Sequence, residues 1–333
     1  MTELNPRVSV AFQTDKTLAE YAELGRLAEG YGFGTVSVYS DLMFQPPLPA
    51  LLSMAAATTR VRLGPACLNP FTVHPVEIAG QMTMLDQASR GRAYLGLARG
   101  AWLDSIGVQP KRPLQAIRQA VEVIRRLLTR DAAGFGGEVF SLRPGQQLEY
   151  ETNGNVPLLI GTWGPKLAAL AGELADEVKV GGSANPEMVA AMRNWIAVGS
   201  ALVRRPAAQV GIILGAVTVV DEDGGRARIR AREEVARYLP VVAPFDPTFA
   251  MEPGLFSRVD KLVHQRDFSA AGALIPDDVL ARFAFAGTPS EVTAQAASVL
   301  AAGAARVEFG TPHGLTAKEG LRLLGEKVLP ALH

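Results

Sequence analysis

Short apolar runs recur along this chain, and most of them are followed by a segment with helical periodicity. Eight runs are rich in Val, Leu and Ile, which is typical of strands that are buried on both faces of a sheet. They lie at residues 8–12, 35–39, 61–66, 92–97, 157–161, 177–181, 210–219 and 305–309. The pattern therefore predicts a sheet of parallel strands joined by helical crossovers.

The segments between these runs carry apolar residues at helical spacing. In residues 114–128 the apolar positions 114, 117, 121, 124 and 128 follow a 3-4-3-4 spacing, and charged side chains fall on the other face. Thr288, Pro289 and Glu291 form a helix start with a capping hydroxyl, a first-turn proline and a reciprocal acid. Further helices are predicted at residues 18–31, 48–58, 75–88, 165–175, 186–203, 225–238, 289–302 and 316–332.

Eight strands alternating with helices are compatible with a closed barrel or an open sheet. No glycine-rich dinucleotide fingerprint follows the first strand, which disfavours the open sheet. We therefore predict one (β/α)8 barrel, a TIM barrel with insertions, over residues 1–333. Residues 131–155 are glycine-rich with alternating apolar positions and predict a hairpin-like excursion. Residues 239–287 form a long insertion before the last strand, which is expected to be a lid or an oligomer contact.

Composition narrows the choice of partners. Hydrophobic residues make up 48% of the 333 residues, and 33 basic residues balance 33 acidic ones, so neither nucleic acid nor a membrane surface is an expected partner. The chain start lacks a signal-peptide pattern, and we expect a cytoplasmic protein. The single Cys67 excludes internal disulfides. His74, His264, His313 and His333 show no metal-ligand spacing, so no metal is expected.

Several segments in order resemble one known family. They are Ser40-Asp41, residues 63–70 (LGPACLNP), 91–97 (GRAYLGL), 112–114 (RPL) and 160–166 (IGTWGPK). On these residues the chain resembles the bacterial luciferase-like barrels, and within them the coenzyme F420 (deazaflavin)-dependent branch typified by methylenetetrahydromethanopterin reductase. The resemblance covers nearly the whole chain, and the block from the third to the fifth strand is specific in order and spacing.

The resemblance implies a cofactor site at the carboxyl ends of the strands, where barrel enzymes carry function. It places a non-proline cis peptide at Ala66–Cys67, where the residues alone favour an ordinary strand end with a buried cysteine. It places the cofactor phosphate at the two turns after the fifth and sixth strands, where helix-start amides and Lys166 favour an anion. The implied cofactor contacts are Asp41, Ala66, Cys67, Leu68, Asn69, Leu97, Ala98, Arg99, Gly100, Gly161, Thr162, Trp163, Gly164, Pro165, Lys166, Gly181, Gly182 and Ser183.

The implied function is a coenzyme F420-dependent oxidoreductase that transfers hydride between the deazaflavin and a small organic substrate. Asp41, Tyr39 and Gln13 are the candidate catalytic residues, because Ala11 stands where the reductase has an acid and Leu42 where relatives commonly have histidine. An FMN-dependent monooxygenase with a partner reductase is the alternative, and a non-catalytic barrel is a third reading. The family also implies a homodimer formed beside the second and third strands, where the alanine-rich segment 48–58 would allow close helix packing.

Overall fold

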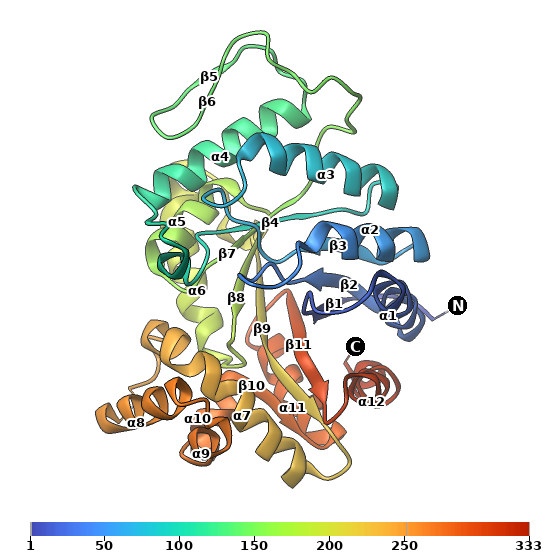
Figure 1. Cartoon of the computed structure of the whole chain (residues 1–333), viewed down its shortest axis with the longest axis vertical. Coiled ribbons are helices and arrows are strands. Elements are labelled where there is room, and N and C mark those ends of the chain that lie inside the picture. Colours follow the sequence, from blue (N-terminus) through green and yellow to red (C-terminus); the bar gives the residue numbers. More distant parts are fainter. Residues whose placement is uncertain (1, 251, 333) are drawn as a thin grey trace.

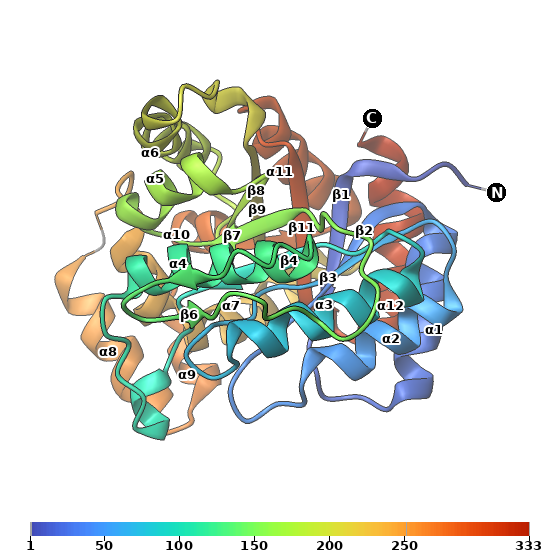
Figure 2. The same cartoon turned by 90° about the horizontal axis from the view of Figure 1, so that it is seen from above.

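The computed structural model describes residues 2–250 and 252–332, and its centre is an eight-stranded parallel barrel surrounded by helices (Figures 1 and 2). The strand order is β3-β2-β1-β11-β9-β8-β7-β4. The ends of this order meet, because the Leu63 amide donates to the Arg92 carbonyl at 3.0 Å and the Leu68 amide to the Gly96 carbonyl at 2.9 Å. The barrel strands are β1 (Asn5–Phe12), β2 (Phe33–Val38), β3 (Arg62–Pro65), β4 (Leu95–Ala98), β7 (Leu158–Gly161), β8 (Glu177–Gly181), β9 (Gly211–Val220) and β11 (Arg306–Gly314). The predicted fold is confirmed.

Helices cover the outside of the barrel, close to the predicted positions. They are α1 (Leu18–Tyr31), α2 (Pro47–Ala57), α3 (Pro75–Ser89), α4 (Pro113–Leu128), α5 (Pro165–Leu174), α6 (Glu187–Leu202), α7 (Gly224–Val242), α11 (Pro289–Ala301) and α12 (Ala317–Leu323). In α4, Ile117, Val121, Ile124 and Leu128 are buried as the spacing predicts, whereas Leu114, in the first turn of the helix, is exposed. No helix among the described residues is both long enough and apolar enough to cross a membrane.

Two predicted helical features differ from the structure. The helix predicted at residues 316–332 ends at Leu323 and continues as a π turn over Leu324–Val328. A side chain at Gly325 would collide with the Tyr31 ring, so the chain packs closely against α1 at this turn. In α2, Ala50 and Ala55 are buried within the chain's own core, which leaves only Ala56 and Ala57 of the four alanines for contact with a second copy.

The two long connections lie at opposite ends of the molecule (Figure 1). The first carries the antiparallel strands β5 (Phe135–Gly136) and β6 (Ser141–Leu142). The second begins after α7, which runs to Val242 and so extends past the predicted boundary at residue 239. It contains α8 (Pro253–His264), α9 (Phe268–Ala273), α10 (Asp277–Phe283) and a ninth strand, β10 (Ala284–Gly287), which pairs with the end of β9.

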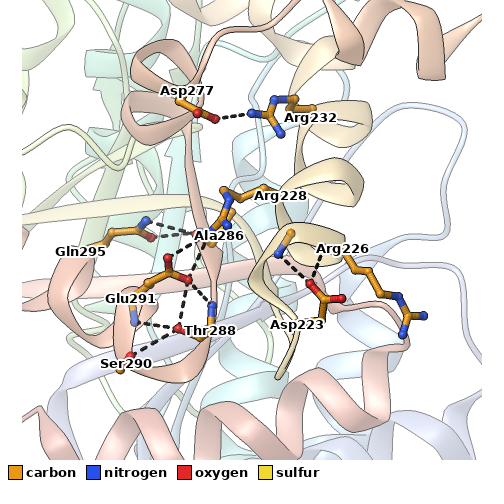
Figure 3. Close-up of polar contacts among 11 residues, drawn as sticks. Asp223, Arg226, Arg228, Arg232, Asp277, Ala286, Thr288, Ser290, Glu291 and Gln295 are labelled. Carbon is orange, nitrogen blue, oxygen red and sulfur yellow. Dashed lines mark hydrogen bonds and ion pairs between the residues drawn. The ribbon is translucent and has the colours of Figure 1, made fainter.

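Polar side chains join α7 to α11 and tie each of these two helices to the second connection (Figure 3). Arg228 of α7 pairs with Glu291 of α11 at 3.0 Å, and Arg232 of α7 pairs with Asp277 of α10. Glu291 also completes the predicted capping box with Thr288, so one carboxylate caps α11 and holds α7. The Gln295 amide accepts from the Ala286 amide at 3.0 Å and donates to its carbonyl at 3.2 Å, which covers part of the edge of β10.

Candidate active site

Small residues line the upper, carboxyl-terminal end of the barrel interior. Side chains alternate along a strand, and Val10, Leu97, Ile160, Val180 and Phe309 belong to the layer between strands and helices. Their neighbours therefore face the barrel axis. These neighbours are Ala11, Gly96, Ala98, Gly161, Gly181 and Gly310, joined by Gly215 on β9. A methyl group at Gly181 would meet no other atom within 4 Å, so this end of the barrel has free space.

The lower, amino-terminal end of the interior is filled by three charged residues from three strands. Arg306 pairs with Glu177 at 2.7 Å, and Arg62 reaches the same carboxylate at 3.0 Å. Burial acts to raise the pKa of Glu177, but the charges of Arg306 and Arg62 outweigh it, and this pKa lies below its ordinary value. We call Arg62, Glu177 and Arg306 the lower triad.

A second polar group, the middle network, lies above the lower triad. It consists of Ser37, Tyr94, Lys179 and Glu308, which are all buried. Lys179 forms an ion pair with Glu308, and Ser37 donates to the other oxygen of that carboxylate. The Ser37 and Tyr94 hydroxyls lie 2.7 Å apart, and burial with the nearby Glu308 charge raises the pKa of Tyr94. Arg62 lies over the Tyr94 ring at 4.9 Å, so the two groups are in contact.

The three predicted catalytic residues lie together at the mouth of the barrel. The side-chain amide of Gln13 donates to the Asp41 carboxylate at 2.8 Å. The backbone amide of Tyr39 donates to the Phe12 carbonyl at 2.9 Å, which holds the ends of β1 and β2 together. The Tyr39 side chain reaches across to β11, where a methyl group at Gly310 would come within 2.5 Å of its hydroxyl oxygen. Within the described ranges 2–250 and 252–332, this half-buried hydroxyl has no hydrogen-bond partner.

The bulge after β3 contains the predicted cis peptide between Ala66 and Cys67. The Cys67 sulfur faces two glycines, since methyl groups at Gly161 and Gly96 would come within 2.8 and 3.2 Å of it. Burial raises the pKa of Cys67 to about 12, so the thiol stays protonated at neutral pH. Cys67 is thus a packing residue of the bulge, as expected from its lack of a basic neighbour in sequence.

The two predicted phosphate turns differ in accessibility. Lys166 at the start of α5 is exposed, and the first amides of a helix have no partner within the helix. In the turn after β8, by contrast, the Ser183 amide donates to the Gly215 carbonyl at 3.0 Å and Val242 of α7 packs over Gly182. Trp163 links the turns, because its indole N–H donates to the Gly181 carbonyl while its ring stacks on Phe245 at 6.1 Å.

Three predicted contact residues turn their side chains away from the mouth. Leu97 and Leu68 are buried in the layer between strands and helices, so only their backbone can face a ligand. The Asn69 side chain accepts from the amides of Phe71 and Thr72 at 3.1 and 3.0 Å, which folds it back onto its own loop.

Arg99, Trp102 and His74 lie on the connections that follow β3 and β4. Arg99 is exposed and has no ion pair among the described residues, so its charge is available at the rim. Trp102 is 44% exposed and is not a core residue. His74 caps α3 by accepting from the Val76 amide at 3.2 Å. No group of three or more potential metal ligands occurs within residues 2–250 and 252–332; His333 lies outside the described residues.

The middle network was not singled out from the sequence. Lys179 and Glu308 lie inside two runs that were assigned as strands from their apolar residues. The available signal was the alternation itself, because a charged residue flanked by Val178 and Val180 in a buried strand must face the interior of a barrel.

The sequence as a whole matches a known family. The family model described as luciferase-like monooxygenase matches residues 4–306. The chain belongs to this family. Among curated relatives, this luciferase-like protein is 29% identical to the 5,10-methylenetetrahydromethanopterin reductase of Archaeoglobus fulgidus, over 98% of the chain and 99% of the relative. It is 25% identical to an F420-dependent glucose-6-phosphate dehydrogenase of Microbacterium testaceum, over 94% and 93% of the two chains.

Solved structures agree on the fold of this luciferase-like protein. The F420-dependent tetrahydromethanopterin reductase of Methanopyrus kandleri superposes with a TM-score of 0.89 at 24% identity, over the full length of both chains. An F420-dependent secondary alcohol dehydrogenase superposes with a TM-score of 0.81 at 18% identity, again over both full chains.

Proposed function

We propose that this protein is a coenzyme F420-dependent oxidoreductase that acts on a small organic substrate with a C=N, C=O or activated C=C bond. The observation that carries the proposal is full-length similarity to relatives named for F420 or for methylenetetrahydromethanopterin reduction. The family assignment and the complete barrel support it, because the whole scaffold of those relatives is present.

The residues at the mouth fit a flat ring with an anionic tail. Gly181 borders free space, and the bulge at Ala66–Cys67 presents backbone and a neutral thiol rather than a bulky side chain. Arg99 and Lys166 are exposed cations at the rim. Such a surface can bind an aromatic ring through the bulge and phosphate through the start of α5.

We assign the ring to Ala66, Cys67, Ala98 and Gly100 with the Leu68 and Leu97 backbone, and the phosphate to the turn before α5 with Lys166. Gly181, Gly182 and Ser183 form the adjoining wall. When bound, reduced coenzyme F420 supplies a hydride from the C5 carbon of its deazaflavin. The chain's own residues orient the substrate, through the Gln13–Asp41 pair, and supply a proton, through Tyr39.

The substrate is left open because two positions depart from the reductase pattern. Ala11 has no group that could transfer a proton, and Leu42 removes an imidazole from the pocket. We therefore do not assign the methanopterin reaction to this chain. The candidates are imines, enones and ketones.

The test is a fluorescence titration of the purified apoprotein with coenzyme F420 and, in parallel, with FMN. Tighter binding of F420 supports the proposal and directs a substrate screen with reduced F420 and small ketones, enones and cyclic imines. Tighter binding of FMN would instead make the protein a flavin-dependent monooxygenase that needs a partner reductase. Binding of neither cofactor would contradict both functions and leave a non-catalytic barrel.

We also propose a homodimer in the cytoplasm. The structure leaves Ala56 and Ala57 on the outer side of α2, next to the half-buried Leu52. Sedimentation equilibrium of the purified protein is the test, and a monomer at all concentrations would contradict the dimer.

A further inference from the structure

The ion pair between Lys179 and Glu308 occupies a place where barrels usually have apolar residues. The interior of a (β/α)8 barrel is normally packed with Val, Ile and Leu in layers. Here the Lys179 and Glu308 side chains are 6% and 1% exposed. A buried ion pair often contributes no more stability than apolar residues of the same volume, so stability alone does not account for this one.

The pair lies directly under Tyr39. The Lys179 ammonium nitrogen is 5.1 Å from the centre of the Tyr39 ring, within the range of a cation–π contact. The Tyr39 ring in turn extends to Gly310 of β11 and forms the floor of the mouth. Tyr39 therefore contacts both the middle network and the space where a substrate would bind.

Lys179 has the opposite effect on Tyr39 from the other ionisable groups around that side chain. Burial raises the pKa of Tyr39 well above its ordinary value, and Glu308, Tyr238, Asp41 and Tyr94 act in the same direction. These groups come from β11, α7, the loop after β2 and the position before β4, and each disfavours a phenolate. Lys179 of β8 is the cation in contact with the ring.

We infer that Lys179 and Glu308 are positioning residues for Tyr39: Lys179 holds its ring and stabilises the phenolate that remains after Tyr39 gives its proton to the substrate, and Glu308 with Ser37 fixes Lys179 in place. This inference rests on the proposed function, because it takes Tyr39 as the proton donor of a hydride-transfer reaction. The Ser37–Glu308 hydrogen bond occupies the carboxylate oxygen that Lys179 does not use.

In the proposed step, hydride transfer to the substrate is coupled to proton transfer from Tyr39. The substrate carbon accepts hydride with its electron pair, and the π electrons of the C=O or C=N bond move to oxygen or nitrogen. That atom forms a bond to the Tyr39 proton as the Tyr39 O–H bond breaks. The substrate is reduced to an alcohol or amine. Oxidation of the cofactor releases a ring N–H proton as well as the hydride, and this proton, passed to water, balances the proton by which water restores Tyr39 from its phenolate.

This arrangement selects a substrate class. A ketone, aldehyde or neutral imine needs a proton on its heteroatom during reduction, whereas an iminium ion accepts hydride alone. Dependence on Tyr39 and Lys179 therefore indicates a neutral carbonyl or imine substrate.

The first experiment uses the apoprotein with 13C at the Cζ atoms of its six tyrosines. The Tyr39 resonance is identified by its loss in Tyr39→Phe. We expect Lys179→Met to move this resonance, because the cation at the ring is gone, and Lys179→Arg to restore most of it. Tyr21 and Tyr31, which lie on α1, serve as internal controls and should not move.

An unchanged Tyr39 resonance in Lys179→Met would overturn the inference, and so would a change that Lys179→Arg does not reverse. Lys179→Met leaves Glu308 buried without its partner and can unfold the chain. If the single variant does not fold, the double variant Lys179→Met/Glu308→Gln is compared with Glu308→Gln, and the difference in the Tyr39 resonance between these two isolates the effect of Lys179.

The second experiment uses reduced F420 and a ketone or imine that the wild type reduces. We expect Lys179→Met to lower kcat about tenfold with little change in KM or in F420 affinity, and Lys179→Arg to recover part of the loss. Equal loss in both variants would show a purely structural role. If F420 does not bind at all, the proposed function fails, whereas the tyrosine spectra still decide whether Lys179 acts on Tyr39.

Discussion

The two ends of the barrel interior are built from the same strands but in opposite ways. At the lower end, Glu177 is held by two arginines, and every charge has a partner at 2.7–3.0 Å. At the upper end the same strands carry Gly181 and Gly310, and the Tyr39 hydroxyl has no partner among the described residues. The difference separates stability from chemistry. The lower charges pair with one another and fix the strands, although the buried Arg306 Nε has no partner among the described residues, whereas the Tyr39 hydroxyl remains open to a ligand.

The middle network belongs to neither end. Its carboxylate is saturated like the lower triad, yet its lysine faces the floor of the mouth through Tyr39. Substitutions in the lower triad, in the middle network and at the mouth should therefore differ in their effects on folding and on ligand binding. These differences test the comparison between the two ends of the barrel.

The largest effect is expected at the lower triad. Glu177→Gln leaves Arg306, which is 4% exposed, without a counter-charge, and should lower the free energy of unfolding by about 3–5 kcal/mol. Urea unfolding measures this change. Glu222→Gln, which breaks an exposed pair with Lys327, is the matched control and should cost less than about 1 kcal/mol. An equal loss of unfolding free energy in the two variants would show that the lower triad stabilises the fold no more than an exposed ion pair does.

A second effect concerns acid stability near the top of β11. Burial, with the nearby Lys16 charge, lowers the pKa of His313 to about 4 from 6.5. Between these values the unfolded chain binds a proton that the folded chain excludes. The contribution of neutral His313 to the free energy of unfolding is therefore fully present above pH 6.5. This contribution falls as the pH drops towards 4, by up to about 3 kcal/mol.

The matching variant is His313→Asn, which tolerates the φ of 74° at this position. Urea unfolding between pH 4.5 and 8 should show a shallower pH dependence for this variant than for the wild type. A slope identical to that of the wild type would assign the acid sensitivity to other groups.

A third effect is the coupling within the middle network. In a double-mutant cycle of Lys179→Met and Glu308→Gln, the double variant should lose less stability than the sum of the single variants, with a coupling of about 0.5–3 kcal/mol. Denaturant unfolding of the four proteins gives this value. Additive losses would mean that the two side chains do not depend on each other, which would also weaken the proposed effect on Tyr39.

The smallest effect on folding is expected at the mouth. Gly181→Ala meets no atom within 4 Å and should leave Tm unchanged, yet weaken F420 binding about tenfold by filling space that a ligand needs. Thermal unfolding and the fluorescence titration are the paired measurements. Gly96→Ala is the contrasting variant, because its methyl group would lie 2.2 Å from the Pro65 carbonyl oxygen and should destabilise the fold. Unchanged F420 affinity in Gly181→Ala would remove this glycine from the proposed site.

The fold was more predictable than the site. Strand and helix positions follow from local apolar periodicity, so all eight barrel strands and α1 with its bounds Leu18–Tyr31 were predicted. The π turn after Leu323 was not predicted, because it depends on contact between Gly325 and Tyr31 on another helix. β10 was also missed, because its residues lie within the segment 239–287 that was assigned as an insertion, and it pairs only with the end of β9.

At the site, position in sequence predicted position in space but not the direction of side chains. Gln13 and Asp41 do meet, as expected for the ends of adjacent parallel strands. Leu97 was expected at the cofactor, yet alternation along β4 turns it to the helices. The Lys179–Glu308 pair joins β8 and β11, which are far apart in sequence but flank β9 in the sheet, and the two side chains meet across Gly215.

The fastenings of the second long connection have a consequence for engineering. Arg228, Glu291 and Gln295 lie on α7 and α11, outside residues 243–283, and they join elements that flank that segment. The segment also shares a core with α7, because Leu255, Val259 and Val279 pack in one cluster with Val235 and Leu239. An exchange of residues 243–283 between related barrels must therefore include the α7 side chains that pack against them if the scaffold is to stay folded.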